Sequence, residues 1–232
     1  MIEAAAALAR VDFGPVRLTV ALAATTTLIL LVLGTPLAWW LAFTRSRAKP
    51  FVEAITALPL VLPPTVIGFY LLILMSPTAP LGALWRDATG STLAFSFIGL
   101  VAASIVYSLP FTVQPLQAAF DAVGRSPLEA AATLGASPLD AFFSVASPLA
   151  LRGYVTAGVL TFAHTVGEFG VVLMVGGNIP GRTKVISIAI YEHVETINYT
   201  QAHVLSALML GFSFAVLLTV FLVNRRFPIH AR

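Results

Sequence analysis

Five long stretches of this sequence are almost free of charged side chains. Four of them, residues 18–43, 54–85, 88–120 and 204–223, contain no Asp, Glu, Lys or Arg, and the fifth, residues 154–175, contains only Glu168. The hydrocarbon core of a membrane is about 30 Å thick, so a helix needs about 20 apolar residues to cross it. Each stretch is therefore long enough to cross a membrane once.

The composition excludes the main alternatives to a membrane protein. Charged residues make up 10% of the chain and hydrophobic residues 58%, whereas a soluble domain carries about 25% charged residues. A chain this apolar is not disordered, and the absence of cysteine excludes disulfides, thiolate metal sites and cysteine catalysis. The basic residues lie between the apolar stretches, which indicates a membrane surface rather than nucleic acid as partner. The sequence thus predicts an all-α integral membrane protein.

We expect a single transmembrane domain, residues 1–232, with five membrane-spanning helices. The first apolar stretch is too long for the core of a cleavable signal peptide, which has about 7–15 apolar residues. The predicted spans are residues 18–43, 54–76, 93–117, 152–175 and 203–223, and a long loop, residues 121–150, joins the third span to the fourth.

The distribution of basic residues predicts the orientation. Five crossings put the two chain ends on opposite sides of the membrane, with eight basic residues on one side and five on the other. The positive-inside rule then places the C-terminus and residues 121–150 in the cytoplasm and the N-terminus outside. The cytoplasmic group is Arg45, Arg47, Lys49, Arg125, Arg152, Arg225, Arg226 and Arg232, and the outer group is Arg10, Arg17, Arg86, Arg182 and Lys184.

Prolines interrupt the first three predicted spans. A proline inside a helix frees a backbone carbonyl, which hydrocarbon cannot satisfy but a bundle interior or a wet cavity can. Six prolines in three consecutive spans therefore favour a transport bundle over simple anchors. We expect Pro59, Pro63 and Pro64 to break the second span next to the transport pathway; the other three are Pro36, Pro110 and Pro115.

The loop between the third and fourth spans contains signals for two short helices. Ser126 is expected to cap a helix that starts at Pro127, with Glu129 completing a capping box. Gly135 is expected to end this helix in the left-handed conformation. The same pattern follows with Ser137 as cap, Pro138 as first helical residue and Asp140 two residues later.

This loop also resembles the signature loop of permease subunits of ABC importers. The pattern is Glu-Ala-Ala, three residues, Gly, nine residues and Ile-x-Leu-Pro; here it reads Glu129-Ala130-Ala131, Gly135, Val145, Ser147 and Pro148, with Ser147 departing from the pattern. The resemblance implies the type I ABC importer permease fold, in which this loop forms a coupling helix that docks on a separate ATPase. The residues expected at that contact are Glu129, Ala130, Ala131, Leu134 and Gly135.

Further motifs resemble the molybdate/sulfate branch of this family. They are Leu58-Pro-Leu-Val-Leu-Pro-Pro64, Gly167-Glu-Phe-Gly170 and Gly177-Asn-Ile-Pro-Gly181. Sulfate relatives more often carry Tyr at the position of Phe169, so the resemblance favours molybdate (and tungstate) over sulfate or thiosulfate. It implies two copies of this chain, two ATPase subunits that use ATP and Mg, and a periplasmic or lipid-anchored binding protein. This chain is then no enzyme and binds no cofactor itself.

Glu168 is the charge in the membrane that most needs a role, because such residues are usually functional. His164 lies one helical turn earlier, so the two could form a metal pair or a proton relay. A carboxylate would repel an oxyanion, so we expect Glu168, Phe169 and Gly170 to form a hydrogen-bonded gate or a subunit contact instead. A buried carboxyl that is simply satisfied by hydrogen bonds is the alternative.

Other functions have less support in the sequence. Residues 176–183 read Gly-Gly-Asn-Ile-Pro-Gly-Arg-Thr, which is close to a phosphate-binding loop, but Arg182 stands where the essential lysine belongs. An ATP-independent channel or secondary transporter would need no coupling loop. An intramembrane hydrolase would need a nucleophile and a base that the sequence does not pair.

Overall fold

Three helices that lie close together form the centre of the molecule. The computed structural model describes residues 12–226, without the side chains of Val220 and residues 223–226. The central helices are α2 (Gly14–Phe43), α6 (Phe97–Val123) and α10 (Leu151–Gly167). They approach closely where a glycine faces a small side chain: a Cβ added at Gly153 would lie 2.2 Å from the Cβ of Ala119. Small residues at such contacts are typical of helix packing in membranes.

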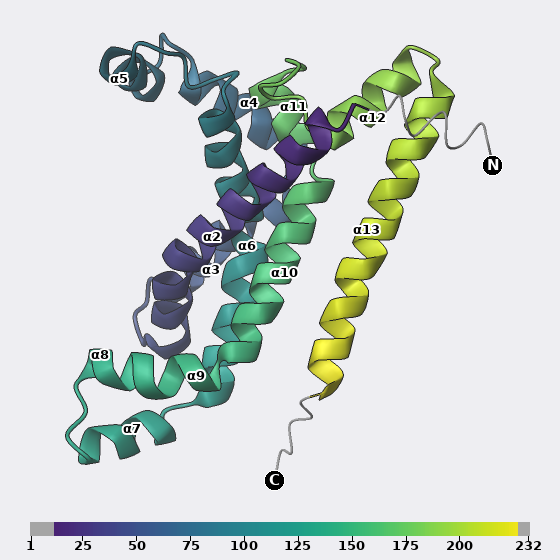
Figure 1. Cartoon of the computed structure of the whole chain (residues 1–232). Helices are drawn as coiled ribbons and strands as arrows, with labels where there is room; N and C mark the ends of the chain where they lie inside the picture. The colour runs from purple at the N-terminus through teal and green to yellow at the C-terminus, as the bar shows by residue number, and fades with distance from the viewer. Residues whose placement is uncertain (1–11, 227–232) are drawn as a thin grey trace.

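The remaining helices cover one flank and the two ends of this centre (Figure 1). In chain order they are α3 (Lys49–Val61), α4 (Pro64–Met75), α5 (Pro80–Thr89), α7 (Ser126–Thr133), α8 (Pro138–Ala141), the π-helix η1 (Phe142–Ala146), α9 (Ser147–Leu149), α11 (Gly170–Gly176), α12 (Ile186–Glu195) and α13 (Tyr199–Arg226).

Three of the five predicted spans form single long helices, namely α2, α6 and α13. The second span, residues 54–76, is instead divided between α3 and α4, which meet at an angle of 110°. The fourth, residues 152–175, is divided between α10 and α11, with Glu168 and Phe169 between them. In the described residues, three helices are long and apolar enough to cross a membrane, or up to five spans if each of two bent pairs counts as one, namely α3 with α4 and residues 138–149 with α10.

The three prolines of the second predicted span have different effects on its helices. Pro63 and Pro64 lie at the break, where Pro63 precedes α4 and Pro64 is its first residue. Pro64 fits there because the amide it lacks has no partner inside a helix. The prediction that Pro59 also breaks the span is wrong, because Pro59 lies buried inside α3. It removes only one hydrogen bond, and it does so in the last turn of a helix that ends two residues later.

Exposed apolar side chains cover the outside of the bundle. Many large hydrophobic residues on α3, α4 and α13 are 36–82% exposed, including Phe51, Val61, Phe69, Leu210 and Phe214. Water would not tolerate such a surface, whereas lipid or a further subunit would.

The molecule has two distinct ends (Figure 1). The last turn of α2, the start of α3 and the helices α7 to α9 lie at one end. Helices α5 and α12 and the start of α13 lie at the other. The segment between α6 and α10, residues 124–150, is called the interhelix loop below. Its helices α8, η1 and α9 run across the end of the bundle, and α8–α9 meet α10 at an angle of 70°.

Candidate functional site

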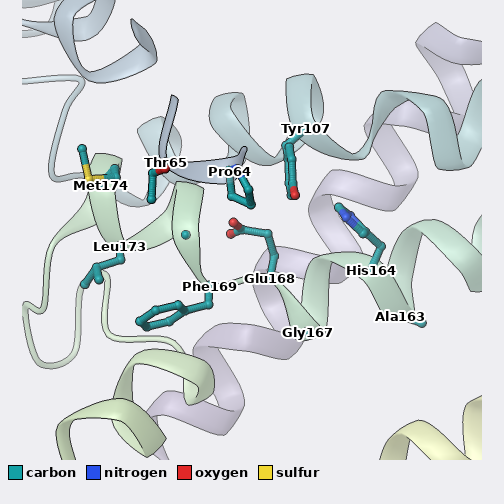
Figure 2. A pocket seen from close by; sticks show the side chains of 11 residues that line it. Pro64, Thr65, Tyr107, Ala163, His164, Gly167, Glu168, Phe169, Leu173 and Met174 are labelled. Atoms are coloured by element: carbon teal, nitrogen blue, oxygen red, sulfur yellow. The ribbon is translucent and has the colours of Figure 1, made fainter. Parts of the chain in front are cut away.

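The two broken spans meet at a cavity of about 560 Å³. Its walls come from the start of α4, the middle of α6, the end of α10 and the start of α11. Figure 2 shows Tyr107 of α6 facing the side chains of His164 and Glu168. Most of the other lining residues are apolar or glycine, so these three side chains and Thr65 supply the polar side-chain groups of the cavity.

Two glycines allow α4 and α11 to lie against each other beside this cavity. A Cβ added at Gly170 would lie 2.6 Å from the Cβ of Pro64, and one added at Gly68 would lie 2.7 Å from the Cβ of Met174. Real Cβ atoms do not come so close. The glycine that ends the Gly167-Glu-Phe-Gly170 motif therefore permits the contact between the two helix breaks.

Glu168 closes the break between α10 and α11. Its side chain is 5% exposed, and its two carboxylate oxygens accept hydrogen bonds from the backbone amides of Val171 (2.6 Å) and Val172 (3.0 Å). These amides belong to the first turn of α11, where no helical carbonyl is available. The negative charge also lies at the positive end of the α11 dipole. Glu168 is thus satisfied by the backbone of the half-helix that follows it.

The break is also attached to α12. Ser187 donates a hydrogen bond to the backbone carbonyl oxygen of Glu168 (2.7 Å). The ring of Phe169 lies 5.1 Å from that of Tyr191. The Glu168–Gly170 segment therefore connects three elements: Glu168 caps α11, Phe169 packs on α12 and Gly170 contacts α4. Whether this segment is a gate or a subunit contact stays a prediction.

His164 and Glu168, which the sequence suggested as a pair, have different hydrogen-bond partners. Nδ1 of His164 lies 2.9 Å from the hydroxyl of Ser108 on α6, and the imidazole ring stacks on Phe111 with a centroid distance of 3.9 Å. Among the described residues, no group of three or more His, Asp or Glu side chains is arranged to hold a metal ion.

The protonation of His164 Nδ1 follows from counting donors. The hydroxyl of Thr165 donates to the carbonyl oxygen of Thr161 (2.9 Å), so its contact with Ser108 (3.1 Å) requires Ser108 to be the donor. Ser108 has one hydroxyl proton, so it accepts from His164. Nδ1 of His164 therefore carries a proton, and Nε2 is the nitrogen left for other partners.

The interhelix loop contains the second candidate site. Gly135 has φ +88°, and the amides of Gly135 and Ala136 donate to the carbonyl oxygens of Ala132 (3.0 Å) and Ala131 (3.1 Å). This is the Schellman motif, and it ends α7 as the sequence predicts. The side chain of Leu134 beside it is 89% exposed. An apolar side chain this exposed at the end of a membrane bundle indicates a contact surface.

Only one of the two predicted helix caps is formed. Ser137 accepts a hydrogen bond from the amide of Asp140 (3.2 Å) and caps α8. The predicted capping box of Ser126 and Glu129 is wrong, because Ser126 is itself the first residue of α7 and Arg125 occupies the cap position. A helix that starts one residue earlier removes Ser126 from the extended conformation that a capping side chain needs. Glu129 and Ala130 are exposed and Ala131 is buried.

The loop between α11 and α12 closes on itself. The carbonyl oxygen of Ile179 accepts from the amides of Arg182, Thr183 and Lys184, so these amides are not available to cradle a phosphate. Lys184 forms an ion pair with Glu192 on α12 (2.5 Å). Hydrogen bonds from Lys184 and from Asn178 lower the pKa of the Glu192 carboxyl, so this connection persists at neutral pH and is lost on acidification through the lowered pKa.

A helical membrane bundle with two broken spans and a structured loop at one end defines a membrane transport component. The chain belongs to the family of binding-protein-dependent transport system inner membrane components, whose family model matches residues 34–227.

Individual relatives and solved structures indicate which members of this family the chain resembles. The chain is 57% identical over 216 residues to the "Molybdenum transport system permease protein ModB" of Azotobacter vinelandii, covering 93% of this chain and 95% of the relative. It is 35% identical over 205 residues to the "Probable sulfate transport system permease protein cysT" of Zygnema circumcarinatum, covering 88% and 69%. Its fold matches a chain of a bacterial ABC transporter involved in alginate import, with a TM-score of 0.76, 16% identity and coverage of 97% and 83%.

The double hydrogen bond of Glu168 makes a testable prediction. Glu168→Gln keeps one acceptor oxygen but turns an amide N–H₂ toward a backbone N–H, so it should lose part of the transport activity. Glu168→Leu leaves both amides of the α11 turn without a partner, at a cost of about 1–3 kcal/mol for each, and should lose most of the activity and lower the melting temperature of the purified protein.

The measurements are substrate uptake at equal expression and thermal unfolding in detergent. An exposed carboxylate on α5 provides the matched control, because Asp87→Asn removes one negative charge, from a side chain that is 68% exposed, without touching α11 or the interhelix loop. Full uptake and unchanged melting in Glu168→Leu would show that capping α11 is dispensable.

Proposed function

We propose that this protein is the permease subunit of an ABC importer that carries molybdate, and tungstate, across the inner membrane. The observation that carries the substrate assignment is the 57% identity, over nearly the whole of both chains, to a protein named as a molybdenum transport permease. The alternative is a sulfate or thiosulfate permease, which is supported by relatives with lower identity. The motifs around Pro64 and Glu168 resemble the combined molybdate/sulfate branch and so do not separate the two.

The direct test is uptake by vesicles that contain the chain with its ATPase and binding protein. Radiolabelled molybdate should accumulate when ATP is supplied, and an excess of unlabelled tungstate should compete more strongly than the same excess of sulfate. Accumulation of sulfate in preference to molybdate would assign the chain to the sulfate branch. Uptake of either anion without ATP would instead support a channel or a secondary transporter.

ATP hydrolysis is assigned to a separate ATPase subunit, since the phosphate-loop-like segment lacks the lysine and has its amides bonded within the loop. The chain itself would bind no cofactor, and ATP and Mg would be used by that partner. The exposed end of α7 at Leu134 supports the ATPase contact. A second copy of the chain would cover part of the apolar outer surface, and a periplasmic or lipid-anchored binding protein would deliver the anion.

The proposed orientation places the interhelix loop and the C-terminus in the cytoplasm and the N-terminus outside. Arg45, Arg47 and Lys49 support it, because they follow α2 at the same end as the interhelix loop (Figure 1). Arg10, Arg232 and the side chains of Arg225 and Arg226 lie outside the described residues.

Cysteine labelling tests this orientation in a chain that has no cysteine of its own. A cysteine at the exposed position Thr89, at the end of α5, should react with an impermeant thiol reagent added to intact cells. A cysteine at Ser46, after α2, should be protected until the cells are opened. The reverse pattern would place the interhelix loop outside and would contradict the ATPase contact.

Gly135 provides the sharpest test of energy coupling. A Cβ at this position would meet no atom within 4 Å, so a substitution acts through the left-handed backbone alone. That conformation costs an ordinary residue about 1–2 kcal/mol, which is too little to unfold the bundle but enough to open the turn between α7 and α8. Gly135→Asp should insert normally, bind its ATPase poorly and lose ATP-driven uptake.

The comparison variant is Gly135→Asn, since Asn is close to Asp in size and also occurs in the left-handed conformation but adds no charge. It should retain more uptake than Gly135→Asp at equal expression. Wild-type uptake and ATPase co-purification in the aspartate variant would mean that the interhelix loop is only a connector.

A further inference from the structure

Both ends of the interhelix loop are attached to the last turns of α2. At the entrance, Nη2 of Arg125 donates a hydrogen bond of 2.7 Å to the backbone carbonyl oxygen of Phe43. Phe43 is the last residue of α2, so its carbonyl is one of those that lack a helical donor. The guanidinium charge also lies at the negative end of the α2 dipole.

At the exit, the attachment is aromatic. The ring of Phe142, the first residue of η1, packs edge-on against Trp39 of α2 with a centroid distance of 5.1 Å. Trp39 also contacts Phe43 at 4.4 Å and Phe120 of α6 at 5.1 Å. Edge-to-face pairs of this kind contribute beyond the area they bury and fix the rings in orientation.

The chain changes direction at both points where the loop joins its neighbouring helices α6 and α10, whereas the loop contacts α2 directly. The loop leaves α6 through Gly124, which has φ +68°, and it enters α10 through Ala150 at the 70° bend between α9 and α10. A displacement of the loop can be absorbed as rotation at Gly124, whereas Ala150 is buried and has both backbone groups hydrogen-bonded. The contacts with Phe43 and Trp39 cross from the loop to α2 without passing either bend.

α2 is well placed to carry a displacement into the bundle. Its buried residues, from Pro15 to Leu41, occur along almost its whole length. Near its last turns, Ala38 and Leu41 share one buried cluster with Val113 and Leu116 of α6 and Ala157 of α10. A close-packed contact of this kind transmits small shifts because it has few voids to absorb them.

We propose that the last turns of α2, residues 39–43, receive the movement of the ATPase from the interhelix loop, with Arg125 and Phe142 as the positioning residues that fasten the loop to them. This inference rests on the proposed ATP-driven function. It assigns the first step of transmission to contacts with α2, which is not the chain neighbour of the loop, although the ring of Phe142 also lies 6.1 Å from that of Phe120 of α6.

The test is the amount of molybdate taken up per ATP hydrolysed in vesicles that contain the permease, ATPase and binding protein. Arg125→Met keeps an unbranched, flexible side chain without the donors, and Phe142→Leu keeps an apolar side chain without the ring. Each should lower the ratio of uptake to hydrolysis while the ATPase still co-purifies. The double variant should lower it by at least about fivefold, the lower end of usual coupling between sites.

Two neighbouring residues supply matched controls. Arg47→Met removes a basic residue from the same end of the molecule; Arg47 is exposed and makes no hydrogen bond or ion pair within the described residues. Phe143→Leu changes the next ring of η1, which is 68% exposed and contacts Phe142 rather than α2. Both should keep the wild-type ratio. A wild-type ratio in the double variant would overturn the inference, and so would loss of ATPase binding, since the two residues would then form the docking contact itself.

A distance measurement distinguishes this inference from the proposed function. Spin labels at Ser46→Cys and Ala132→Cys report the separation of the end of α2 from α7, with labelled chains diluted into unlabelled ones. In the otherwise unchanged chain bound to its ATPase, this distance should be the same with and without ATP, and in the double variant it should change. An ATP-dependent distance in the unchanged chain would overturn the inference. Failure of the wild-type protein to take up molybdate would instead overturn only the substrate assignment.

Discussion

A helix that is interrupted within a membrane leaves backbone amides and carbonyls that hydrocarbon cannot satisfy, and the structure around Glu168 follows from this constraint. The carboxylate accepts hydrogen bonds from two backbone amides in the first turn of α11. Ser187 donates a hydrogen bond to the backbone carbonyl oxygen of Glu168. The companion break before α4 is made by Pro63 and Pro64, neither of which has a backbone N–H to satisfy. Both breaks can then lie against each other because Gly170 carries no side chain. The cavity exists because these interruptions are satisfied from within the chain.

The cavity and the interhelix loop, although far apart, are joined by one element. α10 begins after the bend at Ala150 and ends at Gly167, and its 17 residues extend about 25 Å at 1.5 Å per residue. It therefore has a bend at one end and the Glu168 break at the other. Its packing on α2 and α6 through Ala157 and Gly153 leaves these two ends as the places where its direction changes. Because α10 packs on α2, a shift received at the last turns of α2 can reach the break beside the cavity through this helix.

The sequence predicted features that depend on local chemistry. Runs of apolar residues located the long helices, and the left-handed turn at Gly135 followed from its position after a short helix. Two predictions about helix ends were wrong. Ser126 is part of the helix that it was expected to cap, and Pro59 lies within the last turn of α3 instead of ending it earlier. The sequence indicated that Glu168 needs hydrogen-bond partners. It did not indicate that these partners are the backbone amides of Val171 and Val172. The contact of His164 with Ser108 spans 56 residues and had no signal in the sequence, and neither did the attachment of Arg125 to Phe43.

A carboxylate in the wall of a cavity is at first sight an obstacle to an oxyanion permease. At 4 Å, two unit charges repel by about 4 kcal/mol near a protein surface, and by more in a drier site. Here, however, both oxygens of Glu168 are turned toward the amides of Val171 and Val172, and the α11 dipole offsets part of the charge. The remaining repulsion raises the energy of any anion beside the break, so it disfavours a tightly occupied site there. An importer that takes its affinity from a separate binding protein needs such a weak internal site, because an anion held tightly within the membrane would not be released.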